Sequence, residues 1–214
     1  MIEIEAKFPI DDDCVWQKYR ACARIGVYRL GAVEEWFVVD EYLDTLEGDV
    51  RRAGHHLRVR TSGGKQRVTI KSAQSAQPRF SVREETEFPV DGDAREVGSW
   101  VNREAVALIT PLLRGSVLRP SVQLRQQRAE RPVHRGGNAL ATMSLDEVQV
   151  WHAGRCLDEF RVMEFELVPD VELSVLNEMT AVLASDGLTP HPVAKLSRAL
   201  TAVEQALNGT RDVA

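Results

Sequence analysis

The first residues of the chain alternate strictly between charged and apolar side chains. Glu3, Glu5 and Lys7 alternate with apolar residues in the segment 2–8. Because successive side chains of a β-strand point to opposite faces, these three charges share one face and the apolar residues share the other. The segment therefore predicts a strand whose polar face carries two acids and a base, and the fold must give that face a suitable environment.

The same alternation recurs along the chain. Acids and bases both occur on the polar side, at Arg58 and Arg60, at Thr69 and Lys71, at Arg83, Glu85 and Glu87, and at Glu164 and Glu166. One interpretation is an antiparallel sheet with one solvated face, which is the commonest cause of this pattern. The other is a barrel whose charged faces point inward, with amphipathic helices covering its apolar outer faces.

Turn residues and hydrophobic periodicity divide the rest of the chain into strands and helices. After the first strand we expect strands at 36–44, at two segments of 56–72 around Gly63-Gly64, at 79–90, at 121–133 and 140–151 around Gly136-Gly137, and at 159–169. We expect helices at 11–26 ending at Gly26, at 94–113 closed by Pro111, at 173–187, and at 192–209.

Composition limits the class of protein. The 214 residues are 43% hydrophobic, which allows a real core, and we expect a single domain over 1–214. The net charge is −5, and charges of one sign are not clustered along the chain, so nothing indicates binding to nucleic acid or to a membrane. With no leader pattern and no long apolar run, and with three cysteines that lack metal-ligand spacing (Cys14, Cys22 and Cys156), we expect a cytoplasmic protein.

An interior lined by acids and bases would be costly to desolvate unless water or a highly charged ligand filled it. A phosphate chain with a divalent cation satisfies both signs, because Arg and Lys donate to phosphate oxygens while carboxylates bind a hard cation. His55 and His56 form an isolated pair near a turn, and no histidine or cysteine cluster competes for the metal. Mg²⁺ or Mn²⁺ is the expected cation.

The charged motifs resemble those of the CYTH proteins, the triphosphate tunnel metalloenzymes that include class IV adenylyl cyclases and thiamine triphosphatases. Glu3-x-Glu5-x-Lys7 is similar to the E-x-E-x-K signature of that family. Further segments of this chain resemble later motifs of the family and occur in the same order as in the family. They are DEYLDT, RRAGHHLRVR, VTIKS, VREETEF, LRQQR, SLDEV, MEFEL and HPVAKLSRAL. The resemblance covers residues 1–202.

The resemblance implies an α+β fold, an eight-stranded antiparallel β-barrel that forms a tunnel with helices packed outside. It implies metal-binding carboxylates at Glu3, Glu5, Glu164 and Glu166, metal-side or network carboxylates at Glu85 and Glu87, and Asp146 either beside the metal or orienting the basic side chains. It implies phosphate-binding residues at Arg58, Arg60, Lys71, Arg128 and Lys195, with Arg83 completing the wall and Lys7 close by.

Two positions depart from the family pattern or match it ambiguously. Ala194 stands where the family usually has serine before the C-terminal lysine, which removes one polar contact. Arg125 and Arg128 both match the family's arginine on their strand, but they face opposite sides of an unbroken strand, so only one can line the tunnel. We favour Arg128.

The resemblance also implies chemistry on a triphosphate. We expect a metal-dependent hydrolase of inorganic triphosphate, thiamine triphosphate or a nucleoside triphosphate. Lys7 and Tyr42 match a lysine–tyrosine pair implicated as the base in the family's thiamine triphosphatases, a role that requires burial and positive charge to depress the pKa of Lys7. The expected partner is therefore a triphosphate-containing small molecule, bound by a monomer or a homodimer.

Two other functions stay open. A class IV adenylyl cyclase would convert ATP to cyclic AMP and pyrophosphate in the same tunnel, and a non-catalytic module would bind polyphosphate or a nucleotide. The segment LRQQR lacks the lysine of the cyclase-like K-x-R stretch, and the glycine-led loop that precedes the last E-x-E strand in cyclases is not matched. The complete carboxylate set argues against simple binding, so hydrolysis ranks first.

Overall fold

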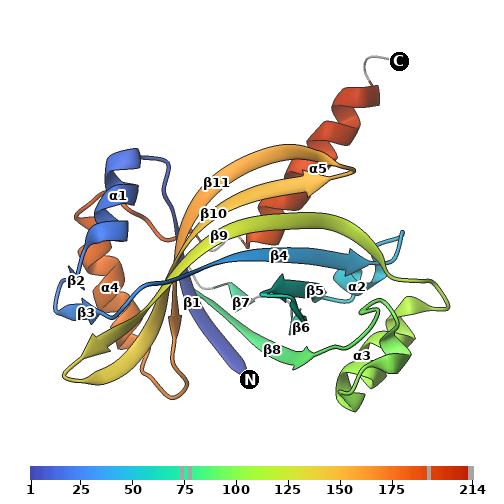
Figure 1. Cartoon of the computed structure of the whole chain (residues 1–214), viewed down its shortest axis with the longest axis horizontal. Coiled ribbons are helices and arrows are strands. Elements are labelled where there is room, and N and C mark those ends of the chain that lie inside the picture. Colours follow the sequence, from blue (N-terminus) through green and yellow to red (C-terminus); the bar gives the residue numbers. More distant parts are fainter. Residues whose placement is uncertain (73–74, 77–78, 192–193, 212–214) are drawn as a thin grey trace.

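Eight long strands close into an antiparallel barrel in the computed structural model, which describes residues 1–72, 75–76, 79–191 and 194–211 (Figure 1). Around the barrel the strand order is β9, β10, β11, β1, β8, β6, β5 and β4, and the pairing of β4 with β9 closes it. Their bounds are β1 (Ile2–Pro9), β4 (Glu34–Asp44), β5 (His55–Ser62), β6 (Lys65–Ser72), β8 (Ser81–Pro89), β9 (Arg119–Arg135), β10 (Asn138–His152) and β11 (Arg155–Leu167). The expected eight-stranded antiparallel barrel is confirmed.

Shorter strands and several helices lie outside the eight barrel strands. The hairpin of β2 (Arg24–Ile25) and β3 (Tyr28–Leu30) pairs with β9, and β7 (Ser75–Ala76) pairs with β8. The helical elements are α1 (Asp13–Ala21), α2 (Asp49–Arg52), the single 3₁₀ turn η1 (Val97–Ser99), α3 (Arg103–Leu113), α4 (Ser174–Ala184) and α5 (Lys195–Arg211). Among the described helices, none has both the length and the apolar character needed to span a membrane.

Strand register places opposite charges beside one another. Lys7 of β1 pairs with Glu164 of β11, and Glu3 of β1 pairs with Arg83 of β8. Residues that pair directly across an antiparallel ladder project from the same face of the sheet, so each pair contributes to one surface. The polar alternation predicted from the sequence is therefore continued from strand to strand around the barrel.

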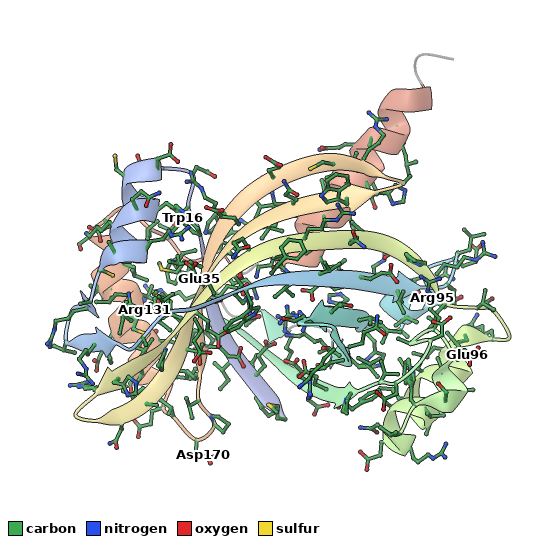
Figure 2. The ribbon with its side chains drawn as sticks, in the orientation of Figure 1. Trp16, Glu35, Arg95, Glu96, Arg131 and Asp170 are labelled. Carbon is green, nitrogen blue, oxygen red and sulfur yellow. The ribbon has the colours of Figure 1, made fainter. Side chains whose placement is uncertain are left out.

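Helices pack against the outer face of the barrel in two places. Trp16 of α1 and Leu176 of α4 join a core with outward-facing residues such as Phe8 and Phe165 (Figure 2, where Trp16 is labelled). At the other end of the barrel, α3 and the segment before it pack against the outer face of β5, β6 and β8, with Trp100 buried there. Burial of this apolar area supplies the main driving force for folding.

The last helix, α5, packs differently. Leu196 and Val203 of α5 contact Leu124 of β9 and Val148 of β10. Leu124 has the same alternation parity as the inward-facing Arg128 on the same strand, so α5 lies against the inner face at one end of the barrel. In Figure 1 this helix runs behind β10 and β11. The start of the helix expected at 192–209 lies partly outside the described residues, and α5 continues to Arg211.

The predicted helix 11–26 is shorter than expected. It ends at Ala21, because the backbone of Cys22 is extended, with φ −65° and ψ 143°. Gly26 is instead the first residue of the two-residue turn between β2 and β3, with a φ of +56° that favours glycine. A Cβ at this position would also approach Val182 of α4 to 2.9 Å, so the glycine is explained by the hairpin and by packing.

The predicted helix 94–113 is divided. Its first part is the turn η1, the backbone of Trp100 is extended, and α3 begins after Asn102, whose side chain accepts a hydrogen bond from the backbone N–H of Ala105 at 3.0 Å. Pro111 does not end the helix, which continues to Leu113. A proline so near the helix C-terminus removes only one backbone hydrogen bond, and packing of Leu113 against the outer core favours the continued turn.

Candidate functional site

The inner faces of the strands surround a cavity of about 300 Å³. Its lining includes nearly every site residue expected from the sequence, namely Glu3, Glu5, Lys7, Tyr42, Arg58, Arg60, Lys71, Arg83, Glu85, Glu87, Arg128, Glu164, Glu166 and Lys195. Asp146 is fully buried behind this surface. The sequence pattern therefore identified the residues that the barrel brings together, and the open question is how they are arranged.

Glu3 is held by two cations from neighbouring strands. Its carboxylate accepts hydrogen bonds from Lys71 Nζ and from Arg83 Nε, each at 2.6 Å, and Arg83 also contacts Glu5. Burial alone would raise the pKa of Glu3, but Lys71 and Arg83 outweigh it and lower that pKa to about 2. Glu3 is therefore ionised throughout the physiological pH range.

Asp40 fixes two arginines, and the sequence analysis did not single it out. Its carboxylate accepts two hydrogen bonds of 2.7 Å from Arg60 and one of 3.2 Å from Arg58, and Gln126 donates a further one at 2.7 Å. Burial opposes the charge, but the two guanidinium groups hold the pKa of Asp40 well below its usual range. Asp40 lies two residues before Tyr42 on β4, so both side chains face the same side of the strand. This spacing was the feature of the sequence from which Asp40 could have been assigned to the cavity.

A second buried carboxylate, on β10, performs the same role two strands away from β4. Asp146 accepts two hydrogen bonds of 2.7 Å from Arg128 and one of 2.5 Å from Lys195. Lys195 also donates to Glu164 at 2.9 Å. With both of its oxygens engaged by cations, Asp146 fits the orienting alternative of the two roles that the resemblance implied.

Lys7 lies between two acids. Its ammonium group contacts Glu5 and approaches Glu164 Oε1 to 3.6 Å. Burial would lower the pKa of Lys7, yet the two carboxylates outweigh it and raise that pKa. A base role requires a depressed pKa, so these contacts favour Lys7 as a charged donor. Tyr42 lines the same cavity, and burial raises the pKa of its hydroxyl.

Glu166 stands apart from these ion pairs. It is solvent-accessible and makes no ion pair or hydrogen bond with the described residues that would neutralise it. Partial desolvation in the cavity and the negative charges of Glu3 and Glu5 raise the pKa of Glu166 to about 7. Oxygen donors with excess negative charge are what a hard divalent cation prefers. In the described part of the chain, however, no three such groups converge closely enough to hold an ion without side-chain movement.

Three further residues belong to the cavity wall and were not assigned a role from the sequence. His56 and Glu130 share the inward parity of Arg58 and Arg128 on their strands, and Asp40 that of Tyr42. Burial and nearby cations lower the pKa of His56, so its imidazole is neutral at pH 7. Applying the alternation rule one step further along each strand would have found all three.

The choice between Arg125 and Arg128 is also decided by geometry. Arg128 lines the cavity. The guanidinium carbon of Arg125 lies 4.1 Å from the centre of the Trp151 ring, on the opposite face of the strand. Arg128 is therefore the residue that can meet a ligand inside the barrel.

A CYTH-domain family model matches residues 1–187. The chain belongs to the CYTH family. No curated protein matches it. Among the matched segments are the β1 signature and the Glu164–Glu166 strand, so the match includes most of the wall that surrounds the cavity of this CYTH barrel.

Several solved structures share the fold of this CYTH chain. A candidate adenylyl cyclase from Hippeastrum, reported to have a dominant triphosphatase activity, is 19% identical with a TM-score of 0.62, over 91% of this chain and 93% of that one. A candidate adenylate cyclase from Bacillus halodurans is 18% identical with a TM-score of 0.61, over 92% and 96%. A protein from Pyrococcus horikoshii is 18% identical with a TM-score of 0.57, over 91% and 96%. At these identities the likeness shows the fold alone.

Proposed function

We propose that this protein is a divalent-cation-dependent hydrolase that cleaves a phosphoanhydride bond of a triphosphate-containing small molecule. The supporting observation is that buried cations and carboxylates pair with each other inside one cavity of about 300 Å³. A phosphate chain can replace the carboxylates as the acceptor for those cations, and the released carboxylates can then bind a metal ion. Family membership and the dominant triphosphatase activity of the Hippeastrum protein support the same class of reaction.

The donor chemistry of the site fits a divalent cation. Glu166 is partly desolvated and lies beside the negative charges of Glu3 and Glu5, which together raise its pKa, and Glu164 supplies further oxygens within the same wall. These four carboxylates would hold Mg²⁺ or Mn²⁺ once the phosphates engage the neighbouring lysines and arginines. When bound, such a cation supplies charge neutralisation at phosphate oxygens.

The residues of the chain supply positioning and electrostatic stabilisation. Arg58 and Arg60 are aligned by Asp40, and Arg128 and Lys195 by Asp146, so these cations are already oriented before a ligand arrives. Preorganised donors of this kind stabilise the charge that develops on the transferred phosphoryl group. Lys7 adds a further protonated donor, in place of the base role expected from the resemblance.

Adenylyl cyclisation is the competing reaction in the same cavity. It would use the 3′-hydroxyl of ATP as the nucleophile and release pyrophosphate, whereas hydrolysis uses water and releases orthophosphate. The two reactions share the phosphate-binding residues, so they are distinguished by product. An assay must therefore resolve orthophosphate, pyrophosphate and cyclic AMP.

The test compares substitutions on two faces of β11. Purified protein is assayed with Mg²⁺ or Mn²⁺ against inorganic triphosphate, thiamine triphosphate and ATP. Glu164→Gln is expected to lower orthophosphate release by roughly 100-fold or more, because it removes an acceptor for Lys195 and a metal donor. Glu159→Gln changes an exposed carboxylate on the outer face of the same strand, where it accepts from Gln149, and is expected to retain activity.

Three results would contradict the proposal. They are cyclic AMP as the main product, turnover that is unaffected by removing divalent cations, and wild-type turnover in the Glu164→Gln variant.

A further inference from the structure

His56 is a basic side chain of the charged cavity that no carboxylate holds. It lies on β5 with the inward parity of Arg58 and Arg60, and it lines the cavity. Each lysine and arginine of the described lining forms an ion pair with a carboxylate. The imidazole of His56 makes no hydrogen bond or ion pair with the described residues, and neither of its ring nitrogens is a buried atom without a partner. A ligand in the cavity can therefore reach the ring.

Cations face His56 from three other elements. Lys71 pairs with it across the ladder between β5 and β6, Arg83 of β8 lines the same cavity, and Arg51 of α2 lines an adjoining cavity of about 160 Å³ whose wall also includes His56. Burial and these three cations lower the pKa of His56. The arrangement of side chains in the cavity therefore favours the neutral imidazole.

The other polar groups around His56 do not offset these cations. Burial raises the pKa of Tyr42 on β4, so its hydroxyl is neutral. Asp44, at the end of β4, accepts hydrogen bonds from three nearby backbone N–H groups, and Glu47 is exposed to solvent. Glu85 of β8 is paired with a lysine at 3.0 Å. His56 therefore lies beside positive charge that it cannot share until further negative charge arrives.

A bound phosphate chain brings that negative charge. Its oxygens would accept hydrogen bonds from Lys71 and Arg83, the same cations that now disfavour a charge on His56. Negative charge beside an imidazole favours the protonated form. A protonated imidazole donates from both ring nitrogens, whereas the neutral ring donates from one. Protonation would thus convert His56 into a further cationic donor for the phosphates.

We propose that His56 binds the phosphate chain as an imidazolium, and that it takes up one proton from solvent as the ligand enters the cavity. The proton returns to solvent when the product leaves, so turnover consumes none at this residue. This proposal rests on the proposed function for the identity of the ligand. It adds a substrate-binding residue to which the sequence pattern assigned no role.

Calorimetry in buffers of different ionisation enthalpy measures the protons that binding takes up. The probe is diimidotriphosphate, a hydrolysis-resistant analogue of inorganic triphosphate, with Mg²⁺ at pH 7. His56→Gln removes the titrating ring, and His55→Gln is the matched control, because His55 is adjacent but does not line the charged cavity. Wild type and His55→Gln are expected to take up about 0.5 proton per ligand more than His56→Gln. The difference between variants cancels protons exchanged by the analogue and by the carboxylates.

The affinity should carry the same proton as a pH dependence. Because binding raises the pKa of His56, the contribution of this residue to affinity is full below the pKa of the free protein and is lost as the pH rises through the pKa of the complex. His56→Gln is expected to weaken binding about tenfold at pH 6 and less than about twofold at pH 8. A residue with a purely structural role would weaken binding equally at both pH values.

NMR of histidine rings labelled with ¹³C follows the wild-type protein, so the test does not depend on a variant folding. The ring of His56, one of five in the chain, is expected to titrate below about pH 6.5 without ligand and above about pH 7 with the analogue. The proposal is overturned if this titration does not move, if the proton uptake of His56→Gln equals that of wild type, or if its affinity loss is the same at pH 6 and pH 8.

Failure of the proposed function has a different signature. A protein that binds the analogue with uptake of a proton by His56, but releases no orthophosphate from any natural substrate, contradicts the proposed function and supports the role of His56. A protein that does not bind the analogue contradicts both.

Discussion

Asp40 is buried between two arginines, and its carboxylate is the acceptor that fixes both of them. Only 1% of its surface is exposed, so neither it nor its partners could remain charged without the others. The same arrangement recurs at Asp146 with Arg128 and Lys195. At the scale of single residues, the cavity is therefore built from cations that bind a ligand and from buried acids that hold those cations in place.

Replacing Asp40 tests this arrangement through stability and its pH dependence. Asp40→Asn leaves Arg58 and Arg60 without their acceptor and is expected to lower the free energy of unfolding at pH 7 by about 3 kcal/mol. Because the pKa of Asp40 is lowered on folding, its stabilising effect is full above the unfolded pKa of about 4 and is lost as the pH falls toward the folded value. Thermal unfolding from pH 7 to pH 2 should therefore show a difference between wild type and variant that shrinks at low pH. A constant difference would contradict the account.

The sequence predicted the lining of the cavity but not its internal partners. Alternation on single strands was enough to select residues such as Glu3, Arg60 and Glu166, because a strand fixes which face each side chain takes. It could not show that Asp40 holds Arg58 and Arg60, or that Lys7 approaches Glu164, because these contacts depend on which strands become neighbours. The raised pKa of Lys7 follows from Glu5 of its own motif together with Glu164 of the neighbouring strand β11, and only the first of these was visible in the motif.

At the scale of elements, one acid joins two helices that lie side by side at one end of the barrel (Figure 1). Asp186, just after α4, accepts hydrogen bonds from Tyr19 Oη at 2.5 Å and from Lys18 Nζ at 2.6 Å, both on α1. Tyr19 is buried and Lys18 is exposed. If Asp186 were lost, the exposed ammonium group of Lys18 would be hydrated by solvent, whereas the buried hydroxyl of Tyr19 would not.

Tyr19→Phe and Lys18→Ala separate these contributions. Tyr19→Phe leaves an apolar ring but removes a charge-assisted hydrogen bond, and is expected to cost about 1–2 kcal/mol, or a fall in Tm of about 2–8 °C. Lys18→Ala removes a solvent-exposed ion pair and is expected to cost under about 1 kcal/mol. Calorimetric unfolding measures both. The account is wrong at this point if the lysine variant is the less stable of the two.

Long periodic elements were predictable from the sequence and short ones were not. The hairpin of β9 and β10 followed from two alternating segments around Gly136-Gly137. The two-residue strand β2 and the single turn α2 carry too few residues to show a period, and they exist because neighbouring elements supply their hydrogen bonds and packing. Gly26 and Pro111 were interpreted as helix ends from local rules, which tertiary packing overrode.

At the scale of the whole molecule, the apolar core changes sides along the barrel. Val133 of β9 packs outside, in the core with α1 and α4, whereas Leu124 of the same strand packs inside against α5. The alternation of side chains along β9 is unbroken between Leu124 and Val133. The sequence pattern alone therefore does not reveal that the apolar core moves from the inner face to the outer face of the strand. This arrangement leaves the charged residues in the middle of the barrel interior, with an apolar cavity beside them under α5.

The most direct test of the central claim is a crystal structure of the protein with inorganic triphosphate and Mn²⁺, in which anomalous scattering locates the metal. The account predicts an ordered triphosphate inside the barrel, within hydrogen-bond distance of Arg58, Arg60 and Arg128, and a manganese peak at the carboxylates of Glu164 and Glu166. Triphosphate bound only on the outer surface, or a barrel interior that retains its ion pairs and holds no phosphate at saturating ligand, would contradict it.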